Sequence, residues 1–288
     1  MTDRRGEDGF QRLLDWTVRE ERALAGGYPE SGRQSFLDYY VRLPGPDDEA
    51  AIARFRRGMW RSEAGWTARW IAARRRSGRP ARVLDAGSGF GTHAMLFAAA
   101  GAEVTGVDLR PDRLEVAGAR VAAAGARLGL QLAVRHVRAD LTRTWDADYD
   151  LVWVYNALSH IDPPEDFLAT ARRHLAADGV LVVGDINGEH PGHTRRLAAL
   201  REQVHQEYLA PDGQRAHYAV EREFGADDLR RLVLENGYRV VRHELVWGGL
   251  GVLPGPLYDW VLRPLQGNWR LGRRIARRQW LVAAPAGD

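Results

Sequence analysis

Residues 83–91 read Val83-Leu-Asp-Ala-Gly-Ser-Gly-Phe-Gly91, and they carry the clearest structural signal in the chain. Three glycines stand at alternate positions directly after a short apolar run, and an alanine-rich helical pattern follows at Gly91–Ala100. Glycine at the end of a strand lets a ligand approach the main chain closely. The stretch therefore predicts a strand, a ligand-binding turn and a helix, in that order.

Short apolar runs alternate with helical stretches on both sides of this turn. Unbroken apolar runs suit strands that are buried on both faces, and a helix is predicted between two of them at Pro163–Ala177. The alternation predicts an α/β fold with a doubly wound, parallel sheet and right-handed crossovers. The predicted strands are Arg82–Ala86, Glu103–Asp108, Leu130–Val137, Tyr149–Tyr155, Gly179–Ile186, Tyr238–Val246 and Gln279–Ala284.

The rest of the chain divides into a cap and two insertions. Residues 1–79 are predicted to form a helical N-terminal cap, with helical spacing at Leu13–Ala25 and Glu49–Ala73 joined by a stretch containing Gly, Pro and Tyr. The sheet domain then covers residues 80–288. Its predicted insertions lie at about 187–223, which is polar, and at about 247–278, which is rich in Gly, Pro and Trp.

Composition excludes several classes of protein. The chain has 288 residues, of which 45% are hydrophobic and 27% charged, as in ordinary globular proteins. It has no cysteine, so disulfides, thiolate metal sites and cysteine nucleophiles are excluded. A net charge of +3 gives little support to nucleic-acid binding. A polar N-terminus and the lack of a long apolar run predict a cytoplasmic protein.

The spacing of the glycines also indicates which nucleotide cofactors the turn can bind. After Gly87 and Gly89, the third glycine of the G-x-G-x-x-G dinucleotide pattern is replaced by Thr92, which argues against NAD. A phosphate loop of the Walker type requires a Gly-Lys pair, and the chain contains no lysine. This excludes the usual ATP-binding loop.

The acid and three glycines, Asp85, Gly87, Gly89 and Gly91, resemble motif I of the class I S-adenosylmethionine-dependent methyltransferases. The resemblance covers about Ala81–Ile186 and includes small-molecule methyltransferases like those of ubiquinone biosynthesis. It implies a Rossmann-like, seven-stranded sheet with S-adenosylmethionine as the cofactor. It says nothing about the first eighty residues.

Further cofactor contacts follow from the strand ends. Asp108 lies 21 residues after Gly87, the spacing at which a carboxylate reaches ribose hydroxyls, and the resemblance gives it the same role. By resemblance, Asp140 and Leu141 contact the adenine and Asn156 lies beside the sulfonium. The predicted cofactor-binding residues are Asp85, Gly87, Ser88, Gly89, Gly91, Asp108, Leu109, Asp140, Leu141 and Asn156.

Three histidines are candidates for a general base, because a neutral imidazole accepts protons near neutral pH. His160 follows the fourth predicted strand, and His190 and His193 lie in the insertion after the fifth. Loop packing is the alternative for His160, and an exposed loop for the other two. No metal is predicted, because His-Pro-Gly-His lacks the helical spacing that puts two imidazoles on one face.

Four tyrosines are candidates for contacts with the acceptor: Tyr28, Tyr39 and Tyr40 in the cap, and Tyr155 at the end of the fourth strand. Core packing is the alternative for the cap aromatics. The segment 257–278 mixes Trp with Arg, which allows contact with an anionic membrane surface or a homodimer partner.

The predicted function is methyl transfer to an oxygen or nitrogen of a small molecule, of the kind made in bacterial secondary metabolism. Three alternatives stay open. One is a cyclase or another displacement at the sulfonium, the second is a lipid or RNA methyltransferase, and the third is a non-catalytic protein that binds the cofactor or a partner.

Overall fold

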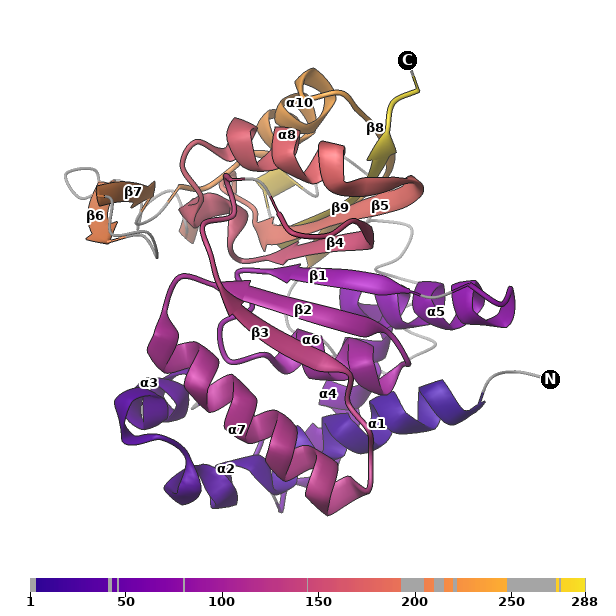
Figure 1. Cartoon of the computed structure of the whole chain (residues 1–288), viewed down its shortest axis with the longest axis vertical. Helices are drawn as coiled ribbons and strands as arrows, with labels where there is room; N and C mark the ends of the chain where they lie inside the picture. Colours follow the sequence, from indigo (N-terminus) through magenta and orange to yellow (C-terminus); the bar gives the residue numbers. More distant parts are fainter. Residues whose placement is uncertain are drawn as a thin grey trace. The chain divides into compact units, whose positions relative to one another are not determined.

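The computed structural model describes residues 4–40, 43–45, 47–79, 81–143, 145–192, 205–209, 215–219, 222–247, 273–274 and 276–287. The chain divides into two units, Met1–Ala139 and Asp140–Asp288. Figure 1 shows the elements of both. The predicted α/β fold with a seven-stranded sheet is confirmed. The sheet is mixed rather than entirely parallel as predicted, because the strand Ala276–Pro285 runs antiparallel to both of its neighbours.

The first unit contains three parallel strands. They are β1 (Arg82–Ala86), β2 (Glu103–Asp108) and β3 (Val134–Arg138), in the order β3-β2-β1. Ala86 pairs with Val107, so the carboxyl ends of β1 and β2 lie side by side. Ligands bind at this end of the strands in doubly wound sheets.

Two helices connect these strands. Helix α6 (Thr92–Ala99) starts directly after the glycines, and α7 (Pro111–Leu128) joins β2 to β3. Proline suits the first turn of α7, because it has no N–H and an N–H at this position would lack a partner within the helix. Gly129 ends the helix in the left-handed conformation.

Helices also occupy the N-terminal 79 residues. They are α1 (Arg4–Arg19), α2 (Glu21–Leu24), η1 (Ala25–Gly27), α3 (Glu30–Tyr40), α4 (Glu49–Arg61) and α5 (Glu63–Arg76). Helix α1 contacts α6, and α3 contacts α7. A Cβ on Gly32 would lie 2.5 Å from the carbonyl oxygen of Asp112, so glycine permits the close approach of α3 to α7. The predicted boundary at residue 79 stays a prediction.

One prediction about this region was wrong. The single helix expected over Glu49–Ala73 breaks at Ser62, whose Oγ caps α5 by accepting a hydrogen bond from the Ala64 N–H (3.2 Å). The stretch between the two expected helices contains α3, whose Phe36 and Tyr40 are buried. Apolar burial of one face therefore stabilises this helix, for which the sequence analysis made no prediction.

The second unit contains four strands of the sheet. They are β4 (Tyr149–Tyr155), β5 (Leu175–Ile186), β9 (Ala276–Pro285) and β8 (Tyr238–Trp247), in the order β4-β5-β9-β8. Strands β4 and β5 are parallel, whereas β9 runs antiparallel to both β5 and β8. The helices are η2 (Leu158–His160), α8 (Pro164–His174) and α10 (Ala226–Glu235).

The helix predicted over Pro163–Ala177 is shorter than expected. It ends at His174, and β5 begins at Leu175, which pairs with Tyr149 before the register shifts. The predicted insertion at 187–223 contains the antiparallel hairpin of β6 (His205–Leu209) and β7 (Arg215–Ala219). Strand β7 contacts η2.

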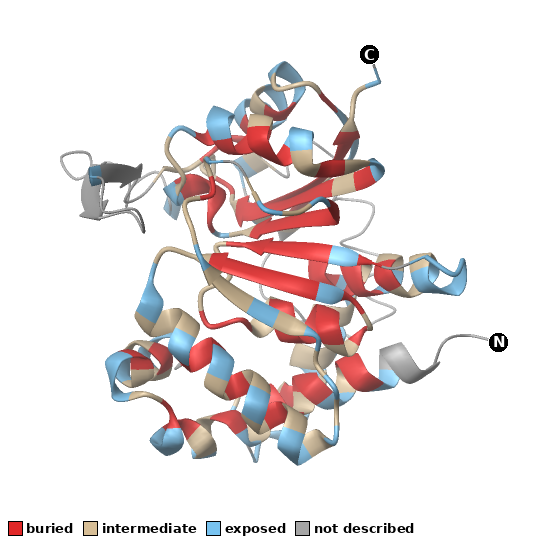
Figure 2. Ribbon diagram, viewed as in Figure 1, coloured by how far each residue is buried: buried red, intermediate tan, exposed pale blue. Residues whose placement is uncertain are grey.

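Most residues of the central strands are buried, and Figure 2 shows them in red along β1, β2, β4 and β5. In β4 the run Leu151–Val154 is completely buried, as the unbroken apolar sequence predicts. No helix among the described residues is long and apolar enough to cross a membrane. Most of the segment 257–278 lies outside the described residues.

One buried side chain joins the beginning of the first predicted insertion to the end of the second. Asn187, which is 0% exposed, follows β5 and donates two hydrogen bonds from Nδ2, to the carbonyl oxygens of Arg273 (3.0 Å) and Ala276 (2.8 Å). Its backbone N–H donates to the carbonyl of Arg277 (3.1 Å). A buried amide satisfied in this way fixes the beginning of β9 against the end of β5.

Candidate functional site

The glycine loop lies between β1 and α6 in the first unit. The φ angles of Gly87, Gly89 and Gly91 are +71°, +52° and +72°, values that residues other than glycine rarely adopt. The N–H groups of Gly87 and Ser88 both donate to the carbonyl of Val107 (2.8 and 2.9 Å), so the loop is held against the end of β2. A Cβ on Gly89 would meet nothing within 4 Å. The loop therefore presents open main chain, as a ligand-binding turn requires.

Asp108 is joined directly to this loop. Its Oδ2 accepts a hydrogen bond from the Gly89 N–H (2.8 Å), and its Oδ1 accepts one from the Arg110 N–H (2.9 Å). Each carboxylate oxygen has a second lone pair, so both can still accept a ligand hydroxyl. The structure thus brings together the two features that the sequence predicted for one ligand. Leu109 follows, half-buried, and its carbonyl accepts from Arg138 Nε (3.1 Å).

Asp85 lies beneath the loop and is only 2% exposed. Burial raises its pKa to about 7, against the opposing effect of a hydrogen bond from the Ala94 N–H, and the negative charge of Asp108 raises it further. Its Oδ2 has no hydrogen-bond partner among the described residues. A buried carboxylate oxygen of this kind suits a cationic donor on a ligand.

His136 on β3 was not predicted for the site. A Cβ on Gly106 would lie 2.9 Å from its Nδ1 and 3.0 Å from Ser88 Oγ, and a Cβ on Gly91 would lie 3.0 Å from its Cε1. Burial, followed by the charge of Arg120, lowers the pKa of His136, so its imidazole is neutral. Neither its ring nitrogens nor Ser88 Oγ have partners in the described part of the chain. The ring fills the space that the two glycines leave behind the loop.

The remaining predicted cofactor residues belong to the second unit. Asp140 Oδ1 accepts hydrogen bonds from the backbone N–H (2.9 Å) and the hydroxyl (2.7 Å) of Thr142. Leu141 is buried, and its carbonyl accepts from Trp145 Nε1 (3.2 Å). Asn156 has a φ of +48° at the end of β4, and its side chain is exposed. Their contact with a cofactor stays a prediction.

A group of polar side chains gathers at the ends of β4 and β5. Tyr155 is half-buried, and the Arg278 guanidinium lies 4.5 Å from the centre of its ring. His160 in η2 is exposed. The buried Asp185 accepts a hydrogen bond from the Ser159 N–H (3.3 Å). Burial raises the pKa of Asp185 to about 6, while His160 and Arg278 oppose the shift. The sequence signal for Asp185 was its position at a strand end, which the predicted site did not include.

The other two predicted histidines belong to the predicted insertion after β5. The Nδ1 of His190 accepts from the Gly192 N–H (3.2 Å) in a local turn, and His193 lies outside the described residues. Among the described residues, no three His, Asp or Glu side chains are grouped so that they could hold a metal ion.

The three cap tyrosines differ in exposure. Tyr28 and Tyr40 are buried with Phe36 and Phe90 in one aromatic cluster, whereas Tyr39 is 61% exposed. Burial raises the pKa of Tyr28 and Tyr40 well above the usual range, so both phenols keep their protons near neutral pH. The contact of these tyrosines with an acceptor stays a prediction.

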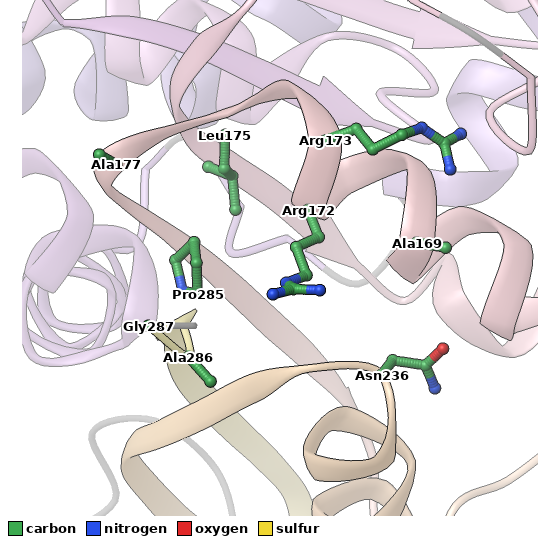
Figure 3. Close-up of a pocket in the computed structure, with 9 residues that line it drawn as sticks. All are labelled: Ala169, Arg172, Arg173, Leu175, Ala177, Asn236, Pro285, Ala286 and Gly287. Atoms are coloured by element: carbon green, nitrogen blue, oxygen red, sulfur yellow. The ribbon is translucent and has the colours of Figure 1, made fainter.

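The second unit also contains a cavity of about 500 Å³ away from all these residues. Figure 3 shows the guanidinium of Arg172 pointing into it between Pro285 and Asn236. None of the predicted site residues lines it.

Comparison with known sequences identifies the central part of the chain. Residues 83–179 match a family model described as a methyltransferase domain. The chain is 32% identical over 107 residues to a ubiquinone biosynthesis O-methyltransferase of Haemophilus ducreyi, covering 37% of this chain and 45% of that protein. It is 30% identical over 129 residues to a demethylmenaquinone methyltransferase of Tropheryma whipplei, covering 45% and 49%. The chain therefore spans less than half the length of these curated relatives.

Solved structures extend the likeness of fold to most of the chain. A magnesium protoporphyrin IX methyltransferase from Synechocystis PCC 6803 with bound SAH matches with a TM-score of 0.53 and 18% identity, covering 89% of this chain and 95% of that one. The CcbJ methyltransferase from Streptomyces caelestis matches with a TM-score of 0.52 and 19% identity, covering 88% and 96%. Residues 83–179, which contain the glycine motif, therefore form a methyltransferase domain, and the solved structures agree with the seven-stranded mixed sheet around it.

Proposed function

We propose that the chain binds S-adenosylmethionine at the glycine loop of the first unit and transfers its methyl group to an oxygen or nitrogen of a small molecule. The observation that carries this proposal is the hydrogen bond from the Gly89 N–H to Asp108, beside a glycine whose Cβ direction is open. The loop offers the main-chain surface, and Asp108 offers the carboxylate, that a nucleoside requires.

The residues present fit this cofactor. The unpartnered Oδ2 of Asp85 can accept from its ammonium group, and the carboxylate of Asp108 can accept from its ribose hydroxyls. Asp85 must be ionised to attract a cation, and its pKa of about 7 makes this depend on pH. The first unit therefore supplies two carboxylates for two different parts of one molecule.

When bound, S-adenosylmethionine supplies a methyl group on a positively charged sulfur, which an acceptor oxygen or nitrogen displaces in line. The protein must hold the acceptor in this line and take up its proton if it is not already lost. His160 is the first candidate for that proton, because it is exposed beside the end of β4 and interacts with the buried Asp185. His190 and His193 are the alternatives on the insertion.

A small-molecule acceptor is supported by the names of two relatives, a ubiquinone biosynthesis O-methyltransferase and a demethylmenaquinone methyltransferase. Tyr155 and Arg278 give the end of β4 an aromatic face and a positive charge. Such a pair suits an aromatic or conjugated acceptor. The proposal also includes an acceptor from secondary metabolism and a cytoplasmic location. It further includes contact of the 257–278 segment with a membrane or with a second copy of the chain.

Calorimetry and product analysis test the proposal. Titration of the purified chain with S-adenosylhomocysteine is expected to give saturable binding, and no heat with either this product or S-adenosylmethionine would overturn it. With methyl-labelled S-adenosylmethionine and an acceptor, the expected products are S-adenosylhomocysteine and a labelled acceptor. Methylthioadenosine with no labelled acceptor would instead indicate a different displacement at the sulfonium.

A further inference from the structure

A buried ion pair joins two distant parts of the first unit. Arg120 in the middle of α7 and Glu21 at the start of α2 are both 0% exposed, and Arg120 Nε donates to Glu21 Oε1. Removing two charges from water is unfavourable unless each finds a partner of opposite charge and further hydrogen bonds. The other nitrogens of Arg120 must therefore have partners, and their identity determines what the pair does.

Those partners belong to the glycine loop and the helix that follows it. One terminal nitrogen of Arg120 donates to the carbonyl of Phe90, and the other donates to Thr92 Oγ1 (2.9 Å). Phe90 lies between two glycines of the loop, and Thr92 is the first residue of α6. A single guanidinium thus holds the loop and its helix from behind.

This contact fixes the orientation of one peptide group. The carbonyl of Phe90 points to Arg120, while the N–H on the same peptide, that of Gly91, donates to the carbonyl of Ser88 (2.8 Å). Both sides of the Phe90–Gly91 peptide are therefore bonded, and the plane cannot turn without breaking one of the two hydrogen bonds. The tight turn from Ser88 to Gly91, which leaves Gly89 open, depends on this plane.

The N-terminal helices form the rest of the surroundings. The guanidinium carbon of Arg120 lies 5.1 Å from the ring centre of Phe36 and 5.0 Å from that of Tyr40, both on α3. The hydroxyl of Tyr40 is hydrogen-bonded to Thr92 Oγ1. Helices α2 and α3 therefore provide the countercharge and the walls that keep Arg120 directed at the loop.

We infer that Arg120 is a positioning residue for cofactor binding, and that Glu21 and α3 make the glycine loop's affinity for the nucleoside depend on the N-terminal helices. This inference rests on the proposed function. Arg120 does not touch the ligand in this account, because it acts through the carbonyl of Phe90 and the hydroxyl of Thr92. The N-terminal helices then have a role in cofactor binding besides any role in enclosing the acceptor.

Calorimetry with S-adenosylhomocysteine on matched variants tests this inference. Removing one partner alone leaves a buried charge, so the main variant is the double substitution Glu21→Gln with Arg120→Met, which keeps similar volumes without charge. It is expected to fold, with Tm within about 5 °C of the original chain, and to bind the nucleoside at least about tenfold more weakly. Arg120→Lys keeps the charge but reaches fewer partners, so its affinity is expected to lie between those of the original chain and the double variant. Arg127→Met, an exposed position on the same helix, is the control and keeps full affinity.

The outcomes separate the inference from the proposed function. A folded double variant with unchanged affinity would overturn the inference and leave the proposed function standing. If the double variant does not fold, Arg120→Lys provides the test. Unchanged affinity in that variant also overturns the inference, and a measurable loss of affinity supports it. If the unmodified chain itself shows no binding, the proposed function fails, and the inference fails with it.

Discussion

At Gly89 the main chain has a φ of +52°, and the space that a side chain would enter is open. Gly89→Val is expected to cost about 1–2 kcal/mol of backbone strain. It should also place a branched side chain where the ligand lies. Calorimetry is expected to show affinity for S-adenosylhomocysteine reduced by at least about 100-fold, because burying a ligand against the loop requires bare main chain.

Gly129 offers a matched control for this substitution. It ends α7 with a φ of +61°, and a Cβ there would also meet nothing within 4 Å. Gly129→Val therefore carries similar strain away from the site, and it is expected to lower Tm without changing affinity. Equal losses of affinity in the two variants would show that strain, rather than occupied space, is responsible.

The pH dependence of binding is expected to follow Asp85. With its pKa at about 7 in the unliganded protein, this carboxyl is mostly protonated at pH 6. A cationic ligand group prefers the carboxylate, so binding releases a proton below pH 7 and becomes weaker as the pH falls, by up to about tenfold per unit. Calorimetry between pH 5.5 and 8 measures this slope. Asp85→Asn is expected to bind weakly with a flat profile, and an equally steep profile in this variant would assign the slope to another group.

The sequence predicted the residues whose roles depend on neighbours in the chain. The glycines and Asp85 belong to one continuous turn, and Asp108 ends the next strand, so spacing along the chain was sufficient to relate them. Arg120, His136 and Asp185 were not predicted. Their roles arise because α7 lies against α2 and the loop, because β3 pairs with β2, and because β5 ends beside η2. Contacts between distant segments leave no signal in residue spacing.

Among the elements, the junction of β5 and β9 depends on the amide of Asn187. Asn187→Ala removes the donor to two carbonyls, that of Ala276, which is buried, and that of Arg273, which is partly buried. Each unsatisfied buried group costs about 1–3 kcal/mol, so unfolding free energy is expected to fall by about 2–4 kcal/mol. Thermal unfolding should show a Tm lowered by about 5–15 °C.

A second asparagine provides the comparison. Asn236 Nδ2 donates to a single carbonyl, that of Leu232 (2.8 Å), at the end of α10. Asn236→Ala is expected to lower the unfolding free energy by about 1 kcal/mol or less. If Asn187→Ala is equally mild, its two hydrogen bonds do not hold the junction.

Elements were predicted well where apolar burial dominates, as in β4, whose unbroken apolar run Leu151–Val154 is fully buried, and in β1, where Val83 and Leu84 are buried. The antiparallel direction of β9 was not predicted, because an apolar run contains no information about which way a strand enters the sheet. The break at Ser62 was missed because helical spacing continues through it. A capping hydroxyl decides where one helix ends and the next begins.

For the whole molecule, binding at the glycine loop is linked to stability. A ligand at 100 times its Kd stabilises the folded state by about 2.7 kcal/mol. Hydrogen exchange with and without S-adenosylhomocysteine is expected to show slower exchange at Gly87, Ser88 and Gly89, whose N–H groups hold the loop to β2 and Asp108. The Gly89→Val variant should show no such protection. Protection restricted to the second unit would place the binding site elsewhere.

The pairing of Trp247 with Ala276 has a consequence for how this fold can change. The chain leaves β8 and enters β9 at paired positions, so the ends of the connection between them lie side by side. A change in the length of this connection is therefore expected to leave the register of both strands unchanged.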